Sequence, residues 1–491
     1  MRHKPRMGND LRQQQAVTQL LQRGKQDEAW RKIRSHLTLA PYDGWFLHEA
    51  ARLARRAGDV DTAQRYYQRA LTLSPQDAGL LNGLGLTHYD AGRFAEAEQH
   101  YRAALQAHDC YAACHNNYAI LLHKQHRYSA ALHQYRQAMR IQPDYTEARY
   151  GMSTLLAHMG QLQEAESQMQ LVMHERNGDR RCQNALGMVQ LQEGNFAAGW
   201  RNYQARYATD NPERFFTLPE LPVRYWQGED LVGMTLLVRT EQGLGDEIQF
   251  CRFLSRVKSE KHAAKVIMIG NAALKPLMAS LKDVDSYLIR EDKHQALPQA
   301  DYWCSLLDLP QHFLNSPQPF NADVPYLSGA PEHQAKWPIA GTGKKIGIVW
   351  KGSSAHKNDS QRSLSHLSEL ATLFSVPDTH WVSLQKGAGE EEVNHFPHLQ
   401  PLGAQFTDYQ DTAAVISQLD LVIGVDTSVI HLAGALGKPC WVMLPAWARD
   451  WRWLENREDS PWYPQMRLFA RGQDEEWSAV VARIKQALQQ L

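Results

Sequence analysis

The stretch "LLNGLGLTHYDAGRFAEAEQHYRAAL", residues 80–105, decides the fold of the first part of the chain. Gly92 separates two runs of helix-forming residues, Ala97 follows it after five residues, and Tyr101 follows after four more. This spacing predicts two antiparallel helices. The glycine forms the turn, the alanine lets the helices approach closely, and the aromatic ring fills the gap to the next unit.

The same pattern recurs every 34 residues along the first two hundred residues. The turn position is occupied by Gly24, Gly58, Gly92, His126, Gly160 and Gly194. The small position five residues later is occupied by Ala29, Ala63, Ala97, Ala131, Ala165 and Gly199. A period of this length predicts an array of about six helix pairs over residues 9–210.

These spacings resemble those of the tetratricopeptide repeat family. Similar arrays bind peptides in other proteins, so the resemblance implies a peptide-binding surface on the first helices of the units. Asn82, Asn116 and Asn117 are the candidates, because side-chain amides can bond an extended peptide backbone. The recurring tyrosines, such as Tyr67 and Tyr135, are interpreted as interior packing residues.

Composition narrows the classes of function. The 491 residues hold 53 basic and 53 acidic side chains, so no overall positive field favours nucleic acid or an anionic membrane as the main partner. No run reaches the roughly 18 apolar residues of a membrane span, so we expect a soluble, cytoplasmic protein. The six scattered cysteines favour free thiols over disulfides or a zinc site.

The hydrophobic pattern changes after an aromatic, proline-rich connector at residues 211–229. Six short apolar runs then alternate with helical segments, at residues 234–240, 264–270, 345–352, 380–387, 419–426 and 439–445. This alternation predicts parallel sheets covered by helices on both faces. We expect an α/β region of two Rossmann-like lobes, at residues 230–328 and 340–475, and a C-terminal helix at 476–491. Ligands bind at the carboxyl ends of the strands in such sheets, so the loops there are the candidate site.

The first of these loops is "TEQGLGDEIQF", residues 240–250. It lacks the third glycine of the dinucleotide fingerprint, so NAD is not expected. Gln242, Gly243 and Gly245 form the approach to a ligand, and Asp246 falls in the first turn of the following helix. There its carboxylate either faces the cleft or caps the helix.

The second loop, "WKGSSAHKNDSQRSLS", residues 350–365, gathers donors suited to phosphate oxygens, with a solvated charged loop as the alternative. The third, "IGVDTSVIHLAGALGKP", residues 423–439, opens a helix whose free amides suit a pyrophosphate, with a plain helix cap as the alternative. The candidate phosphate-binding residues of these two loops are Lys351, Gly352, Ser353, Lys357, Arg362, Asp426, Thr427, Ser428 and His431.

"GVDTSVIHLAGALGKP", residues 424–439, resembles the signature of the glycosyltransferase family 9 heptosyltransferases. The resemblance covers about residues 230–488 and implies a GT-B fold, in which Asp246 is the general base near the acceptor. Lys357 and Arg362 would neutralise the donor phosphates. The residues that would bind the nucleotide sugar are Asp426, Thr427, Ser428 and His431, with Gln385 in a loop near the nucleotide and Lys351, Gly352 and Ser353 in the phosphate loop. The repeats ahead of such a domain also resemble the arrangement in O-linked N-acetylglucosamine transferases.

The end of the chain carries a stretch rich in tryptophan, residues 447–469, and a final helical segment. The aromatic rings of that stretch are interpreted as packing against both lobes, with a cover for the donor base as the alternative. In similar two-lobed transferases the last helix returns to the first lobe, and the same is expected here.

The combined interpretation is a hexosyl- or heptosyltransferase that moves a sugar from a nucleotide-sugar donor to an acceptor, with inversion. The repeats favour a protein side chain as acceptor. The nucleotide sugar is a substrate, so no cofactor is expected, and the absence of a suitable DxD pair predicts transfer without a metal ion. Two alternatives remain: a non-catalytic repeat scaffold with a degenerate transferase domain, and a transferase acting on lipopolysaccharide or oligosaccharide.

Overall fold

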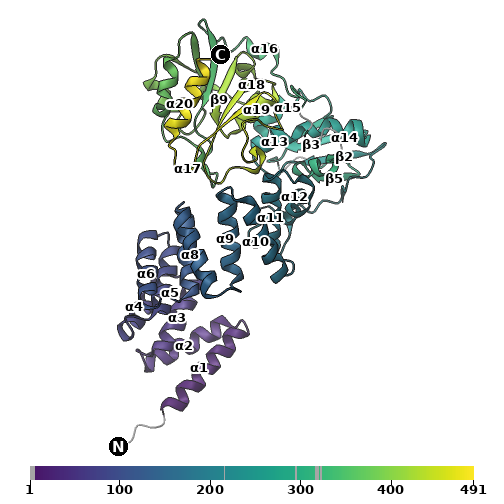
Figure 1. Cartoon of the computed structure of the whole chain (residues 1–491). Coiled ribbons are helices and arrows are strands. Elements are labelled where there is room, and N and C mark those ends of the chain that lie inside the picture. The colour runs from purple at the N-terminus through teal and green to yellow at the C-terminus, as the bar shows by residue number, and fades with distance from the viewer. Residues whose placement is uncertain (1–5, 215, 293–295, 316–319, 321–322) are drawn as a thin grey trace, which may run out of the picture. The chain divides into compact units, whose positions relative to one another are not determined.

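A computed structural model describes residues 6–214, 216–292, 296–315, 320 and 323–491 (Figure 1). The described chain forms two compact units. The first comprises residues up to 156 together with 167–175, and the second comprises 157–166 together with 176–491. None of the described helices combines the length and apolar character needed to cross a membrane.

The repeat pattern folds into successive helix pairs, as the 34-residue period predicts. The helices are α1(Arg6–Gln22), α2(Gln26–Leu39), α3(Gly44–Arg56), α4(Val60–Leu73), α5(Ala78–Asp90), α6(Phe94–Ala107), α7(Ala112–Lys124), α8(Tyr128–Ile141), α9(Thr146–His158), α10(Leu162–Glu175), α11(Arg180–Gln192) and α12(Phe196–Tyr203). Every turn position of the period has a positive φ, from +59° at His126 to +85° at Gly194, and glycine adopts such a φ without strain.

The small and aromatic positions of the repeat lie in the interior. Ala97 and Tyr101 are fully buried. A Cβ atom added to Gly83 would lie 2.5 Å from the Tyr67 ring, and one added to Gly151 would lie 2.7 Å from the Tyr135 ring. The glycines therefore make room for the tyrosines of the preceding unit, which confirms the packing interpretation of those rings.

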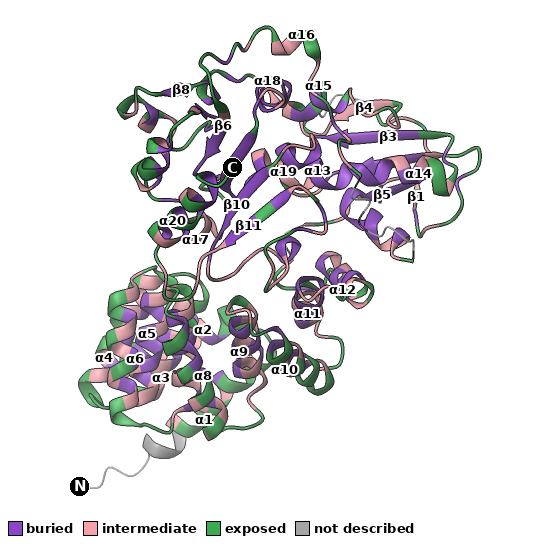
Figure 2. Cartoon of the chain, turned by 45° about the horizontal axis from the view of Figure 1, so that its top comes forward, coloured by how far each residue is buried: buried purple, intermediate pink, exposed green. Residues whose placement is uncertain are grey.

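Two parallel sheets form the α/β part of the second unit. The first has the strand order β1-β5-β2-β3-β4 and the second has the order β11-β10-β9-β6-β7-β8. The strands are β1(Arg224–Tyr225), β2(Thr235–Arg239), β3(Lys265–Gly270), β4(Ser286–Ile289), β5(Tyr302–Ser305), β6(Lys344–Val349), β7(Thr379–Ser383), β8(Leu399–Pro401), β9(Leu421–Val425), β10(Cys440–Leu444) and β11(Met466–Ala470). Figure 2 shows the central strands as buried.

Short helices connect these strands. The α-helices are α13(Leu244–Phe250), α14(Leu254–Lys261), α15(Lys275–Met278), α16(Pro331–Gln334), α17(Asp359–Arg362), α18(Tyr409–Ile416), α19(Ser428–Ala435) and α20(Trp477–Leu488). The 3₁₀ helices are η1(Gln204–Tyr207), η2(Cys251–Phe253), η3(Ala272–Leu274), η4(Leu306–Phe313), η5(Leu367–Ser375), η6(Glu390–His395), η7(Gly403–Gln405) and η8(Trp451–Trp453).

One hydrophobic core runs through most of the second unit. It contains Trp200 and Tyr203 of the sixth repeat, Phe250 of the helix that follows β2, and Trp451 and Trp462 of the segment that follows β10. The predicted role of the tryptophan-rich stretch in packing against both sheets is therefore confirmed. The sixth repeat belongs to this core as well, although the sequence pattern assigns it to the repeat array.

The last helix differs from its expected position. α20 packs with η5 on one face of the second sheet, where Trp477, Val480 and Ile484 are buried in a separate core cluster. The expectation that residues 476–491 return to the first sheet is wrong. The reason is that these apolar side chains complete the face formed by inward-pointing residues of β6 and β9, such as Ile348 and Ile423.

Cys110 is exposed and the other five cysteines are buried. No disulfide joins any of these six residues, all of which lie in the described part of the chain.

Candidate functional site

The three predicted loops follow strands that flank the points where the strand order reverses. The first sheet reverses between β2 and β5, and the second between β6 and β9. Loops diverge at such points and leave a crevice at the carboxyl ends of the strands. The loop before α13 follows β2, while the other two loops follow β6 and β9.

The helices that begin after β2 and β9 meet directly. A Cβ atom added to Gly245 in α13 would lie 2.9 Å from the His431 ring and 3.6 Å from Ser428 Cα in α19. Gly245 therefore serves the close approach of these two helices. The sequence predicts that it makes room for a ligand, but its available space is taken by α19.

Asp246 has two partners, one for each carboxylate oxygen. Its Oδ2 accepts a hydrogen bond of 2.8 Å from the backbone N–H of Gly243, which caps α13. Its Oδ1 forms an ion pair with Arg452. The side chain retains 17% of its exposure. The carboxylate is thus both a helix cap and a half-buried charge at the junction of the two sheets.

Arg452 is the centre of this charged group. Its Nη1 lies 2.8 Å from both oxygens of Asp450, and its guanidinium lies over the ring of Trp451. Burial opposes the charge of Arg452, but Asp246 and Asp450 together raise its pKa. The same arginine lowers the pKa of Asp450, against the effect of burial. Arg452 therefore stays charged and holds two carboxylates.

Burial raises the pKa of Asp246, with Arg452 acting in the opposite direction. Burial also raises the pKa of Asp426 to about 6, and the nearby Asp450 adds to this effect. A carboxyl that is reluctant to ionise is typical of acid–base sites. Asp246, Asp426 and Asp450 thus lie in one region of the structure, and the pKa of each carboxyl is shifted there.

His431 is a buried, neutral imidazole. Burial lowers its pKa to about 3, and the charge of Arg452 acts in the same direction. Its ring stacks on Trp453 at 5.3 Å, its Nδ1 lies 3.1 Å from the Tyr463 hydroxyl, and its Nε2 lies 3.7 Å from Asp426 Oδ1. The structure places His431 beneath Asp426 instead of on the surface of the crevice.

The loop after β6 contains one lysine that is already ion-paired and several side chains that are exposed to solvent. Lys351 Nζ lies 2.5 Å from Glu392 Oε1, so its charge is already neutralised. Arg362 lies beside Gly352, since a Cβ there would lie 2.5 Å from the guanidinium. The charge of Arg362 lowers the pKa of Asp426 against the dominant effect of burial. Ser353 and Lys357 are at least partly exposed.

A contact ties this loop to the segment that carries Arg452. The side-chain amide of Asn358 donates a hydrogen bond of 2.8 Å to the carbonyl of Ala448. Arg452 pairs with Asp246, and the charges of Arg452 and Arg362 act on both Asp426 and His431, so the structure brings these predicted side chains into one region.

Gln385 supports the main chain of that loop. Its Oε1 accepts from the N–H groups of Trp350 and Lys351 at 3.0 Å each, and its Nε2 donates to the carbonyl oxygens of Lys351 and Ala388. The side chain has no amide hydrogen left for a ligand. Any part that Gln385 plays in nucleotide binding must come through the shape of the loop.

Thr427 and Ser428 open α19. Thr427 is the N-cap residue, its side chain makes no capping bond, and its buried hydroxyl has no hydrogen-bond partner among the described residues. The hydroxyl of Ser428 lies 2.5 Å from that of Tyr409. The first amides of an α-helix lack partners within the helix, so this end of α19 attracts anions.

The candidate peptide-binding amides lie on α5 and α7. Asn117 donates a hydrogen bond of 3.0 Å to Asn82 across two successive units. Asn116 is buried, and its Oδ1 has no partner among the described residues. Asn82 and Asn117 therefore form a connected pair, and their role toward a peptide stays a prediction.

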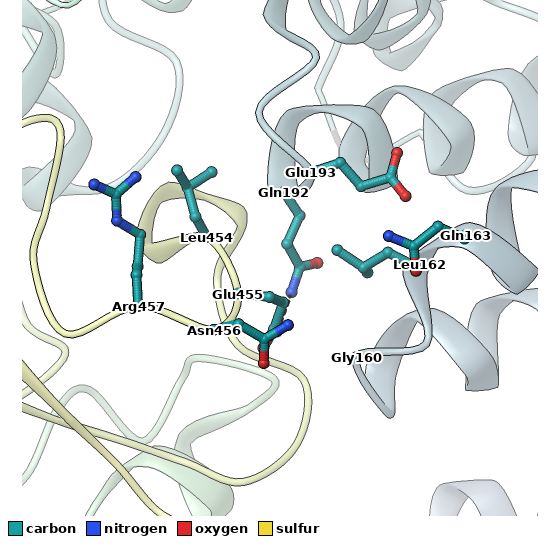
Figure 3. A pocket seen from close by; sticks show the side chains of 9 residues that line it. All are labelled: Gly160, Leu162, Gln163, Gln192, Glu193, Leu454, Glu455, Asn456 and Arg457. Carbon is teal, nitrogen blue, oxygen red and sulfur yellow. Dashed lines mark hydrogen bonds between the residues drawn. The ribbon is translucent and has the colours of Figure 1, made fainter.

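A polar pocket of about 250 Å³ adjoins the segment that carries Arg452 (Figure 3). Gly160, Leu162 and Gln163 of the fifth repeat and Gln192 and Glu193 of the sixth line one side, and residues 454–457 line the other. Gln192 Nε2 donates a hydrogen bond of 2.7 Å to Glu455 Oε1. The wall of the pocket formed by residues 454–457 begins two residues after Arg452.

Sequence reasoning missed Asp450 and Arg452. Both residues lie in the stretch "WARDWRWLENRED", residues 447–459. This stretch was interpreted by its tryptophans, which predict packing, and its charged residues were not considered. A signal was present, because an aspartate and an arginine two residues apart stand among apolar rings shortly after the end of β10. Charges enclosed by aromatic residues need partners, and here the partner is Asp246.

No group of three or more histidine, cysteine or acidic side chains in the described part of the chain is arranged to hold a metal ion.

Comparison with known proteins identifies the repeats. Two family models, each described as tetratricopeptide repeat, match residues 48–110 and 122–189. The chain is also similar to protein FlbA of Caulobacter vibrioides, with 26% identity over 379 residues. That alignment covers 70% of this chain and 62% of FlbA, so the chain matches less than two thirds of the length of that relative.

Solved structures show similarity over part of the chain. PilF of Pseudomonas aeruginosa is 18% identical and covers 41% of this chain and 93% of its own, with a TM-score of 0.37. YrrB, described as a TPR protein with an unusual peptide-binding site, is 21% identical and covers 35% of this chain and 89% of its own, with a TM-score of 0.30. Together with the helix pairs of the structure, the family matches show that the N-terminal region consists of tetratricopeptide repeats.

Proposed function

We propose that this protein is a glycosyltransferase of the GT-B type, which transfers a sugar from a nucleotide-sugar donor to a protein side chain presented by the repeats. The observation that carries the proposal is the ion pair between Asp246 and Arg452. It lies where α13 approaches the first turn of α19. In the proposed reaction, Asp246 of α13 is the base, and the nearby N-terminus of α19 binds the anionic part of the donor.

The donor side of the proposed reaction uses the second sheet. The leaving nucleoside diphosphate is anionic, and it would lie against the first amides of α19 and the cations of the loop after β6. Lys357 is exposed and supplies one charge. Arg362 supplies a second, although its Nε lies 3.3 Å from Asp359 Oδ1, and Lys351 is paired more closely with Glu392. Fixed positive charge and helix amides stabilise a leaving diphosphate in the way that a metal ion does in other enzymes.

The acceptor side uses Asp246. A hydroxyl that attacks the anomeric carbon must lose its proton, and a carboxylate within hydrogen-bond reach can accept it. Burial raises the pKa of Asp246, which strengthens it as a base, while the charge of Arg452 acts to lower that pKa. Attack from the side opposite to the departing phosphate would give inversion at the anomeric carbon.

The pocket of Figure 3 supports a protein acceptor. Its lining combines repeat residues with residues 454–457, which follow Arg452, the ion-pair partner of Asp246, along the chain. The lining is polar, with Gln163, Gln192 and Asn456 among its side chains. Side-chain amides of this kind suit the N–H and C=O groups of a peptide.

The test begins with the donor. A thermal-shift panel of ADP-, UDP-, GDP- and CMP-sugars identifies the nucleotide, and transfer to protein is then followed by mass spectrometry. We expect Asp246→Asn to retain the thermal shift by the donor and to lower transfer by roughly 100-fold or more.

Asp179→Asn is a matched control for that variant. Asp179 also caps a helix, with an Oδ1 that accepts from Cys182 N–H at 3.0 Å, and its Oδ2 lies 3.3 Å from Arg181. It lies outside the proposed site, so transfer should persist. Equal transfer by both variants would reduce Asp246 to a helix cap, and no thermal shift with any donor would favour the non-catalytic scaffold. Transfer to oligosaccharide alone would replace the protein acceptor.

A further inference from the structure

A buried ionic network joins the end of the sixth repeat to the first sheet. Arg206 of η1 is 2% exposed, and its Nη2 lies 3.0 Å from Glu241 Oε1 and 2.6 Å from Asp308 Oδ1. Glu241 stands in the loop after β2, and Asp308 stands in η4 after β5. These are the two strands between which the order of the first sheet reverses. A side chain from the repeats therefore bridges the two loops at this reversal point.

Other groups complete the network. Tyr207 donates its hydroxyl hydrogen to Glu241, and Ser305 donates to the same carboxylate at 2.5 Å. Gln204 donates to Asp308 at 2.7 Å. The guanidinium of Arg206 lies over the rings of Tyr203 and Tyr207, at 4.2 and 4.0 Å from their centroids. Buried charges with this many partners have a single favourable arrangement, because each lost partner leaves a charge unsatisfied.

The next residue of the loop is held from the repeats as well. Gln242 Nε2 donates a hydrogen bond of 2.9 Å to the hydroxyl of Tyr203. Gly243 follows, and its N–H donates to Asp246. A short series of contacts therefore leads from Tyr203 through the loop to the carboxylate of Asp246.

We propose that Tyr203 and Arg206 are positioning residues of the transferase site, which fix residues 241–243 and through them the first turn of α13. The inference rests on the proposed function. It makes the sixth repeat a part of the catalytic site and not only a platform for the acceptor.

The repeat array itself supplies the comparison that supports this view. Tyr101 occupies the same position of the period as Tyr203, three units earlier. Its hydroxyl is buried and has no partner among the described residues. A hydroxyl at this position is therefore not needed for packing within the repeats, and the bond of Tyr203 to Gln242 is a property of the last unit.

The experiment compares Tyr203→Phe with Tyr101→Phe in the full-length chain. Both changes remove one hydroxyl and keep the ring, so the packing of the repeats is retained. The donor is the nucleotide sugar that gives the largest thermal shift. We expect Tyr203→Phe to lower kcat by about 5- to 20-fold, since small misplacements of a catalytic group have effects of this size, and to leave the donor KM within about twofold. Tyr101→Phe should leave both unchanged.

A second measurement does not depend on turnover. Hydrogen–deuterium exchange of residues 241–247 should become faster in Tyr203→Phe and stay as in the wild type in Tyr101→Phe. If the two variants match the wild type in kcat and in exchange, the proposal is overturned. A wild-type chain that transfers no sugar contradicts the proposed function alone, and the exchange comparison then decides this inference.

A double variant guards against an indirect effect. Gln242→Ala removes the other partner of the same bond, so Tyr203→Phe added to it should lower kcat no further. Full additivity of the two losses would show that Tyr203 acts by another route and would contradict the proposal.

Discussion

Asp426 has a largely buried carboxyl whose ionisation should lower the stability of the folded chain. Burial raises its pKa to about 6, so the folded chain binds this proton more tightly than the unfolded chain does. Its contribution to stability is therefore lost as the pH rises through 6. We expect Asp426→Asn to raise the free energy of unfolding at pH 7 by about 1 to 3 kcal/mol, and to give no gain below about pH 4. Urea denaturation at the two pH values measures this.

Asp408→Asn is the control for this prediction. Asp408 caps α18 by accepting from the N–H of Gln410 at 2.8 Å, and its side chain is only partly buried. Its replacement should lower stability at pH 7, because a charged cap at a helix N-terminus is favourable. A gain for Asp426→Asn that is equal at pH 4 and pH 7 would show that burial of its charge is not the cause.

Residues of the candidate site were predictable where local sequence carries the chemistry. The loops after β2, β6 and β9 bring Asp246, Arg362 and Asp426 to one region, as their positions after apolar runs predict. Arg452 could not be assigned in this way. Its partners Asp246 and Asp450 include one residue more than 200 positions away, and such a pairing depends on tertiary packing that no local pattern encodes.

At the scale of the element, the turn between the two helices of a repeat allows the cost of a positive φ to be measured. Gly92 has a φ of +73° and open space where a Cβ atom would lie, so Gly92→Ala changes only backbone strain. We expect a loss of about 1 to 2 kcal/mol in the free energy of unfolding, because L-residues disfavour this conformation. Thermal or urea denaturation of the full chain measures it.

Gly44→Ala is the matched substitution with the opposite expectation. Gly44 lies at the start of α3, and a Cβ there would make an ordinary contact of 3.8 Å with Leu73. Alanine favours helix over glycine by up to about 1 kcal/mol, so stability should stay equal or rise. Similar losses at both positions would show that the strain at the turn is not the dominant effect.

Elements were predictable where they are long or strongly apolar. Each of the six apolar runs that alternate with helical segments contains a strand, from β2 to β10. Five further strands, β1, β4, β5, β8 and β11, were missed. The first four have only two to four residues, which gives too little pattern, and β11 begins in the stretch that was interpreted by its tryptophans. The position of α20 was wrong because it came from a resemblance, whereas the face that it covers is set by the apolar residues of the second sheet.

At the scale of the whole molecule, the repeat array that the sequence period predicts and the compact units of the structure have different boundaries. The 34-residue period extends to about residue 210, but the sixth repeat shares its core with the sheets. Periodicity reports which residues form a helix pair. It does not report what that pair packs against. For the sixth repeat this is decided by tertiary contacts such as that between the rings of Trp200 and Trp451, whose centroids lie 5.4 Å apart.

The shared core predicts where the chain can be divided. A chain of residues 157–491 keeps the sixth repeat, so it should unfold cooperatively and show the same thermal shift with the proposed donor as the full chain. A chain of residues 211–491 removes Trp200, Tyr203 and Arg206 together, which exposes the rings around Phe250 and leaves Glu241 and Asp308 without their buried cation. Loss of one partner of a buried ion pair costs about 3 to 5 kcal/mol, comparable to the stability of a small domain. We therefore expect the shorter chain to aggregate or to lack a cooperative transition in calorimetry, and an equally stable 211–491 chain would mean that the sixth repeat is dispensable to the sheets.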